Sequence, residues 1–438
     1  MRPRRLWTPV IAAALLGLSA GSGAETREDV VIDIIGGVEG ATPIAIVPFG
    51  REGGAAPETE LAPIISANLA RTGRFDLLPE QDHVAMPTRL DEVELPTWRA
   101  SGVDHLVVGG MQPAGSDADG VEVRYELVDL LDGSRTDGRR YRVTEQQMRD
   151  LAHTISDRVY ETITGREGAF TAAIAYVAVE EQGDGEREHR LVVADADGHR
   201  PRTVLTSSEP LLSPAWSPSR DRLAYVSFEG QRSEIFVQDL RTGERERVAS
   251  FQGINSAPAW SPDGERLAVT LSRDGAANIH LIDVATGETS RLTEHWAIDT
   301  EATWAPDGSA IYFTSDRGGA PQVYRVSPEG GPVERVSYEG DYNARPAISP
   351  DGERMAMVHR HDGDYYIAVQ DLDSESVRII SDGPADESPS FAPNGDMVIY
   401  TAGGTEGARL ETASVLGDAV APLDVTEQPG TRVREPAW

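Results

Sequence analysis

Few residues of this chain stand in a spacing that could perform chemistry. The G-x-S-x-G pattern of a serine hydrolase occurs as GLSAG at 17–21, inside an apolar N-terminal leader, so we interpret it as coincidence. His359 and His361 alternate onto one face of an expected strand, but no third metal ligand accompanies them, and we expect a solvated strand edge. The chain has no cysteine, which excludes disulfides, thiolate metal sites and a cysteine nucleophile. We therefore predict no catalytic residue and no metal site.

Two aspartate-rich stretches resemble the start of a calcium loop. They are SDADG at 116–120 and DADG at 195–198, and neither is followed by the bidentate glutamate that completes such a loop. We interpret both as turns. The sequence provides no ligand set for a calcium ion in the channel described below, so we assign no cofactor and leave that ion open.

A short motif recurs through the second half of the chain. It ends at Trp216, Trp260, Trp304, Ile348, Phe391 and Trp438, with spacings of 44, 44, 44, 43 and 47 residues. This period is the length of one four-stranded propeller blade. Each copy is followed by a turn such as SPDG or APNG, whose Gly supplies the positive φ of a tight hairpin, and then by an apolar strand.

The number of strands predicts how the repeat ends. Apolar strands begin near Ile174, Leu223, Leu267, Ile311, Met355 and Val398, but the first has no motif before it, whereas the last motif has no strand after it. We therefore expect 434–438 to form the innermost strand of the blade at 174–206. Residues 171–438 would then form a six-bladed β-propeller closed by the C-terminal strand, which leaves no open edge.

The preceding part of the chain has a different organisation. Residues 25–166 are expected to form a small α/β domain, with buried strands at 44–49 and 103–111, a hairpin at 121–143 and helices at 57–73 and 145–165. The first 24 residues have a basic start, an apolar run and small residues at the end, as in a cleaved signal peptide. Cleavage between Ala24 and Glu25 would export the protein, and no later segment could span a membrane.

The charge of the chain limits its partners. The formal net charge is -32, and all 40 basic residues are arginine. Phosphate binding requires a basic face, so we expect no nucleic-acid partner. An acidic, lysine-free surface would tolerate high external salt, although the sequence alone does not decide whether habitat or base composition caused it.

The connections that lead into the repeated motif should meet at one mouth of the propeller channel, where propellers usually bind partners. Their mixed charge favours a protein partner. Arg345 is the sharpest candidate, because an acidic chain needs a local cation to bind a carboxylate of the partner. The residues that we assign to this docking site are Asn255, Ala257, Thr300, Glu301, Arg345 and Glu387.

The combination of these features resembles the TolB family of the Tol-Pal system. The matching stretches are VVIDIIGGVEGATPIAIVPF, ARTGRFDLL, TSDRGGAPQVYRVSPEGG, FAPNGDMVIYT and the final PAW, and they extend over the mature chain. The resemblance implies a non-catalytic periplasmic adaptor that supports outer-membrane integrity and envelope constriction at division. Its implied partners are the lipoprotein Pal, bound by the propeller, and TolA, bound by the N-terminal segment 25–35, besides other outer-membrane proteins.

The resemblance also assigns residues. INSAPAW and DTEATW match the stretches implicated in Pal binding, and Asp29, Val31, Ile32 and Asp33 fall in the segment implied to bind TolA. Two positions depart from the family, because Ile254 replaces a common histidine and the chain ends at its final Trp. The alternatives are a secreted propeller hydrolase or metal-dependent lactonase, and a carbohydrate- or peptidoglycan-binding module. A ligand cluster inside the channel would favour the enzyme.

Overall fold

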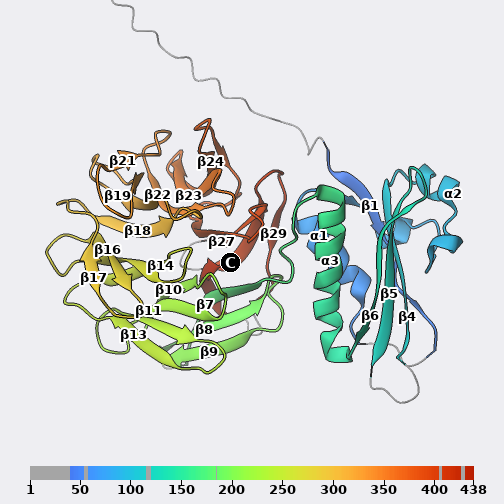
Figure 1. Cartoon of the computed structure of the whole chain (residues 1–438), viewed down its shortest axis with the longest axis horizontal. Coiled ribbons are helices and arrows are strands. Elements are labelled where there is room, and N and C mark those ends of the chain that lie inside the picture. The colour runs from blue at the N-terminus through green and yellow to red at the C-terminus, as the bar shows by residue number, and fades with distance from the viewer. Residues whose placement is uncertain (1–39, 54–57, 115–119, 184, 404–406, 426–429) are drawn as a thin grey trace, which may run out of the picture. The chain divides into compact units, whose positions relative to one another are not determined.

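The computed structural model describes residues 40–53, 58–114, 120–183, 185–403, 407–425 and 430–438 (Figure 1). The predicted signal peptide, its Ala24/Glu25 junction and the segment 25–35 with Asp29, Val31, Ile32 and Asp33 lie outside these residues. Residues 37–438 belong to one compact unit. No helix among the described residues is long and apolar enough to cross a membrane.

The first part of the described chain is a mixed sheet with helices. The sheet has the strand order β3-β1-β4-β5-β6, with β2 paired to β4; β1 is parallel to β3 and β4, and the β4–β5–β6 pairs are antiparallel. Its elements are β1 (Thr42–Ile46), β2 (Gly50–Arg51), α1 (Leu61–Arg71), β3 (Phe75–Leu77), α2 (Leu95–Ala100), β4 (His105–Pro113), β5 (Val121–Asp129), β6 (Arg135–Val143) and α3 (Met148–Thr164), with 3-10 turns at Glu80–Asp82, Leu90–Glu92 and Glu145–Gln147. The predicted α/β fold is confirmed.

The two long helices follow from their apolar spacing. In α1, Leu61, Ile65 and Leu69 are buried, because residues three or four apart share one face of a helix. The chain leaves α1 through Gly73 with φ +67°, and α3 ends at Gly165 with φ +73°, the left-handed conformation that glycine adopts without strain. The sequence did not predict the short α2, whose Trp98 is fully buried under the opposite face of the sheet.

The second part is a six-bladed propeller of four-stranded antiparallel sheets (Figure 1). We number the blades by their motifs: blade 1 is β10–β13, blade 2 β14–β17, blade 3 β18–β21, blade 4 β22–β25, blade 5 β26–β29, and blade 6 β30 with β7–β9. The strands are β7 (Ala173–Glu181), β8 (Arg187–Asp195), β9 (Arg202–Ser207), β10 (Leu211–Trp216), β11 (Arg222–Ser227), β12 (Glu234–Asp239), β13 (Arg245–Ala249), β14 (Asn255–Trp260), β15 (Arg266–Leu271), β16 (Asn278–Asp283), β17 (Thr289–Arg291), β18 (Asp299–Trp304), β19 (Ile311–Ser315), β20 (Gln322–Val326), β21 (Glu334–Arg335), β22 (Asn343–Ile348), β23 (Arg354–His361), β24 (Asp364–Asp371), β25 (Val377–Ile379), β26 (Glu387–Phe391), β27 (Met397–Ala402), β28 (Arg409–Ser414), β29 (Val420–Pro422) and β30 (Arg432–Ala437).

The C-terminal strand closes the ring as predicted. Strand β30 pairs with β7, with Arg434 opposite Val177 and Ala437 opposite Ala175. The same indole contact recurs around the ring: Trp260 Nε1 donates to the Ala215 carbonyl, and Trp216 Nε1 donates to the Ala437 carbonyl, both at 3.2 Å. The seam between the first and last blades is therefore built like an ordinary junction between blades.

The helices of the α/β part and the propeller share one hydrophobic core. Apolar residues of α1 and α3 belong to the same cluster as residues of blades 5 and 6. Polar contacts next to this core converge on Asp396, a residue of blade 5 whose side chain is 1 % exposed. Its partners are the Tyr160 hydroxyl, Arg166 Nε at 3.2 Å and Arg74 Nη2 at 3.4 Å. Burial and these charge-assisted bonds hold the helices on blades 5 and 6.

Candidate docking site at the propeller mouth

A bulge interrupts each inner strand of the propeller at one repeated position. The residue there has a positive φ between 48° and 58°, although it is never a glycine. Such a conformation costs a non-glycine residue on the order of 1–2 kcal/mol, so the surroundings must impose it. We call these residues the bulge ring: Ser213, Ala257, Glu301, Arg345, Ser388 and Glu435.

Hydrogen bonds between neighbouring blades hold the bulge ring. The Arg345 amide donates to Thr314 Oγ1 of the preceding blade at 2.9 Å, and the Glu435 amide donates to Thr401 Oγ1 at 3.0 Å. Across the closing seam, the Ser213 amide donates to Glu435 Oε2 at 2.5 Å. At these three positions the bulge turns a backbone N–H toward the preceding blade, and the hydrogen bond offsets the local strain.

Arg345 is the one cationic residue of the bulge ring. Its Nε donates to Glu301 Oε1 at 2.8 Å, and its Nη1 donates to the Ser388 hydroxyl. Burial disfavours the charged form, but Glu301, Glu435 and Glu387 together raise the pKa of Arg345 above its ordinary value. Because Glu435 lies two blades away, this interaction extends between blades that are not neighbours.

The connections that lead into blades 2, 3 and 4 carry large exposed apolar side chains. Trp296 is 79 % exposed and Tyr338 is 60 % exposed. We call this group the apolar arc: Ile254, Trp296, Ile298 and Tyr338. These connections join an outer strand to the next inner strand, so they share one face of the propeller with the start of each inner strand. Exposed apolar groups beside a charged ring are typical of a protein-docking surface.

The predicted docking residues divide into two groups. Ala257, Glu301 and Arg345 belong to the bulge ring, and Thr300 and Glu387 directly precede ring residues; all five are partly exposed. Asn255 is fully buried, and its side chain bonds to the backbone of Phe251 and Gly253, so it shapes the loop and offers no contact surface. The sequence interpretation missed the apolar arc, although Trp296 and Tyr338 are aromatic residues outside the repeated motif, which is the signal that could have revealed them.

In two other blades, the position equivalent to Asn255 is occupied by an aspartate. The equivalent Asp299 is fully buried, and Arg317 Nη2 donates to both of its carboxylate oxygens, at 2.9 and 2.8 Å. The equivalent Asp386 is 1 % exposed, and among the described residues no donor reaches its carboxylate oxygens in good hydrogen-bond geometry. The Ser381 hydroxyl and the Gly403 and Gly383 amides lie near enough to oppose the effect of burial only in part. Burial raises the pKa of Asp386 to about 6. This carboxylate is therefore destabilising when it is charged.

His359 corrects one sequence interpretation. It is 4 % exposed, and its Nδ1 lies 2.8 Å from Asn343 Oδ1, so it supports the loop before β22. Only His361, with 59 % side-chain exposure, matches the solvated edge that the sequence predicted. The two rings stack at 6.4 Å.

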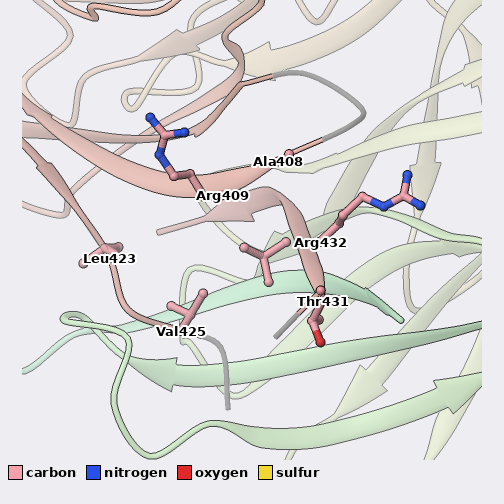
Figure 2. A pocket seen from close by; sticks show the side chains of 9 residues that line it. Ala408, Arg409, Leu423, Val425, Thr431 and Arg432 are labelled. Atoms are coloured by element: carbon pink, nitrogen blue, oxygen red, sulfur yellow. The ribbon is translucent and has the colours of Figure 1, made fainter. Parts of the chain in front are cut away.

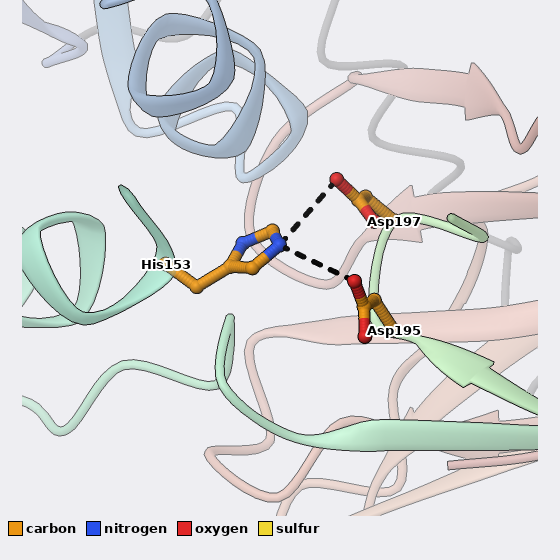
Figure 3. Close-up of side chains that lie close together, drawn as sticks. All are labelled: His153, Asp195 and Asp197. Carbon is orange, nitrogen blue, oxygen red and sulfur yellow. Dashed lines mark ion pairs between the residues drawn. The ribbon is translucent and has the colours of Figure 1, made fainter. Parts of the chain in front are cut away.

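A cluster of metal-ligand type lies where α3 meets blade 6 (Figure 3). His153 Nε2 lies 3.6 Å from Asp197 Oδ2 and 3.9 Å from Asp195 Oδ2. The three side chains, His153, Asp195 and Asp197, could each offer one ligand atom to a metal ion, and these atoms all lie within 4.8 Å of one another. The sequence interpretation treated the two aspartates as a turn, because a histidine 42 positions earlier gives no local signal.

The hydrogen bonds of this cluster do not suit a metal ion. Asn68 Nδ2 donates to His153 Nδ1 at 2.9 Å, and the amide orientation is fixed because Arg71 donates to its Oδ1 at 2.7 Å. The proton of the neutral imidazole must then be on Nε2, the atom that faces the aspartates. Arg149 already binds Asp197, and Arg200 binds Asp195 at 2.7 Å. The cluster therefore joins α3 to blade 6 as an ion-pair network.

A small cavity lies at the seam between blades 5 and 6 (Figure 2). Its volume is about 230 Å³, and Leu423, Val425 and Val433 form its apolar wall. Arg409 and Arg432 extend away from Leu423 and Val425 (Figure 2) and pair with Glu411 and Glu181. Because both guanidinium groups are already paired with carboxylates, neither is free to bind an anionic ligand in this cavity.

Comparison with known proteins gives a consistent picture. A family model described as the TolB beta propeller domain matches residues 160–438, and one described as the TolB amino-terminal domain matches residues 30–136. The chain is 59 % identical over 439 residues to the Tol-Pal system protein TolB of Alkalilimnicola ehrlichii, covering 99 % of this chain and 100 % of that one. It is 57 % identical to the protein of the same name from Nitrosococcus oceani, covering all of both chains.

A solved structure agrees with these relatives. The crystal structure of TolB from Acinetobacter baumannii superposes with a TM-score of 0.82 at 39 % identity, covering 92 % of this chain and 97 % of that chain. The similarity thus includes both the α/β part and the propeller.

Proposed function

The chain belongs to the TolB family, and we propose that it is a non-catalytic adaptor of a Tol-Pal system in the periplasm. In this role it docks the lipoprotein Pal on the propeller mouth and TolA through residues 25–35. It thereby supports outer-membrane integrity and envelope constriction at division.

The apolar arc is the observation that carries the Pal assignment. Interfaces gain most of their affinity from a few buried aromatic or arginine anchors. Trp296 and Tyr338 are aromatic side chains already exposed to solvent, and the partly exposed Arg345 lies in the ring beside them. A Pal surface with an apolar centre and an acidic residue over Arg345 would match this arrangement. Outer-membrane proteins with the same chemistry would compete for it.

The charged groups of the channel favour docking over catalysis. Glu301, Glu387 and Glu435, all on inner strands, lie near enough to Arg345 to stabilise its positive charge. Arg345 binds Glu301 directly, and that ion pair leaves Glu301 poorly available as a metal ligand. A metal-dependent lactonase would require several free ligands at this place, so the channel gives that alternative little support.

Calorimetry of the purified chain with Pal tests the docking site. We expect Trp296→Ala to weaken binding at least tenfold, about 1.4 kcal/mol, because it removes the largest exposed anchor. Leu416→Ala is the matched control, since Leu416 is 45 % exposed but lies in the connection between β28 and β29, on the other face of the propeller. Equal affinities of wild type and Trp296→Ala, or an equal loss in Leu416→Ala, would place Pal elsewhere.

A further inference from the structure

Strand β6 is a long free edge of the α/β sheet. Within the described parts of the chain it has nine residues and pairs only with β5, whereas the outer strands of the propeller blades have two to six. A free edge presents unpaired N–H and C=O groups to any extended chain of suitable chemistry. The chemistry of this edge is therefore informative.

The edge is basic in a strongly acidic protein. Strand β6 contains Arg135, Arg139, Arg140 and Arg142 and one acid, Asp137, whereas the whole chain has a net charge of -32. The acids nearby are shared: Glu122 lies 3.5 Å from Arg140 and 3.8 Å from Arg142. Glu126 likewise lies 3.4 Å from Arg135 and 3.3 Å from Arg124. Because each of these carboxylates faces two arginines, positive charge exceeds negative charge along the edge.

The arginines project to both faces of the sheet. Arg139 is 52 % exposed and shares its face with Asp137, which bonds Tyr125 and faces Arg158 of α3. Arg140 and Arg142 are 64 % and 67 % exposed and project to the opposite face, because side chains alternate along a strand. A flat anionic surface such as a membrane could contact only one of these faces at a time. A strand added at the edge would meet both.

We propose that the free edge of β6 docks an extended acidic segment of a partner protein, which pairs with it as an added strand. Main-chain hydrogen bonds would supply affinity, and acidic side chains on both faces of the added strand would bind the arginines. The remaining acidic surface would repel such a segment, which confines it to this edge. The same arginines repel a second copy of β6, so the edge is unsuited to self-association.

Fluorescence anisotropy with the whole mature chain tests this proposal. The probe is a labelled peptide of about ten residues with glutamates in adjacent pairs, so that both faces of its strand are acidic. One comparison peptide has as many glutamates at alternate positions, on one face only. A second has the paired sequence with alternate amides N-methylated, which blocks strand pairing and keeps the charge. We expect the paired peptide to bind at least threefold more tightly than the alternating one, and at least tenfold more tightly than the methylated one.

Substitutions locate the site on β6. We expect Arg139→Gln to weaken binding of the paired peptide at least threefold. The double variant Arg140→Gln/Arg142→Gln should weaken it by at least the same factor. Arg202→Gln is the matched control, because Arg202 is an exposed arginine at the start of the outer strand β9, and it should leave binding unchanged. Equal binding of the methylated peptide would overturn the proposal, as would an equal loss in Arg202→Gln. Binding to phosphatidylglycerol vesicles that needs Arg140 and Arg142 but not Arg139 would also overturn it and identify a membrane contact.

Discussion

Replacing the terminal tryptophan by alanine tests whether the C-terminal strand β30 contributes as much to the stability of the ring as the inner strands of other blades do. Trp438 is 7 % exposed and packs in the core that the helices share with blades 5 and 6, and its amide donates to Ser390 Oγ at 3.0 Å. Trp438→Ala removes this side chain and leaves a cavity. Substitutions of this kind cost about 3–5 kcal/mol in a core, so we expect the free energy of unfolding to fall by that amount.

Two other tryptophans provide matched controls. Trp260 has the same motif position and the same 7 % exposure, so its loss of packing should match that of Trp438→Ala if the two junctions are equally well packed. Trp260 Nε1 also donates to the Ala215 carbonyl, whereas Trp438 Nε1 has no hydrogen-bond partner among the described residues, so Trp260→Ala should cost about 1 kcal/mol more. Trp296 is 79 % exposed, and Trp296→Ala should change stability by no more than about 0.5 kcal/mol.

Thermal melts and denaturant unfolding of the three variants decide the question. At roughly 2 °C per kcal/mol, the Trp438 and Trp260 variants should melt about 6–10 °C below wild type. A frayed terminal strand would give a different result, with a loss for Trp260→Ala and none for Trp438→Ala. That outcome would refute closure by the C-terminal strand.

Three further predictions concern charge and the N-terminus. The pKa of Asp386, about 6 in the folded chain against about 3.9 unfolded, makes its charged form destabilising above pH 6. Asp386→Asn should thus raise stability at pH 7.5 by about 1–3 kcal/mol and lose this gain as the pH falls to about 4, as measured by denaturant unfolding across pH. Arg345→Met leaves Glu301, Glu387 and Glu435 uncompensated, so its melting temperature should drop, most strongly in low salt. A chain that starts at Gly36 should melt like the mature chain but lose TolA binding in calorimetry; unchanged affinity would refute the role of 25–35.

Local patterns made much of the fold predictable. The helices α1 and α3 follow from apolar residues at helical spacing and from Gly73 and Gly165 after them. The blades follow from a repeat of about 44 residues, and closure follows from the missing first motif and the extra last one. These signals are short-range or periodic, which is why they can be found in a single sequence.

The docking site was less predictable, because its residues differ in burial and backbone state rather than in type. Asn255 and Thr300 looked equally polar in sequence, but one is fully buried and the other is partly exposed. Positive φ at Glu301 and Arg345 is not encoded by those residue types. For Arg345 it depends on a hydrogen bond to Thr314, which belongs to another blade.

The sequence by itself determined the family, the α/β part and the six-bladed ring, because apolar spacing and turn glycines are local signals and the blade repeat is periodic along the chain. The tertiary structure decided which charges meet. It placed His153 beside Asp195 and Asp197. Within the described residues it also gave Asp299 an arginine partner that Asp386 lacks, and it left the arginines of β6 on an unpaired edge. The energy of a charge depends on its distance to other charges and on its burial, and both are set only when distant segments pack together.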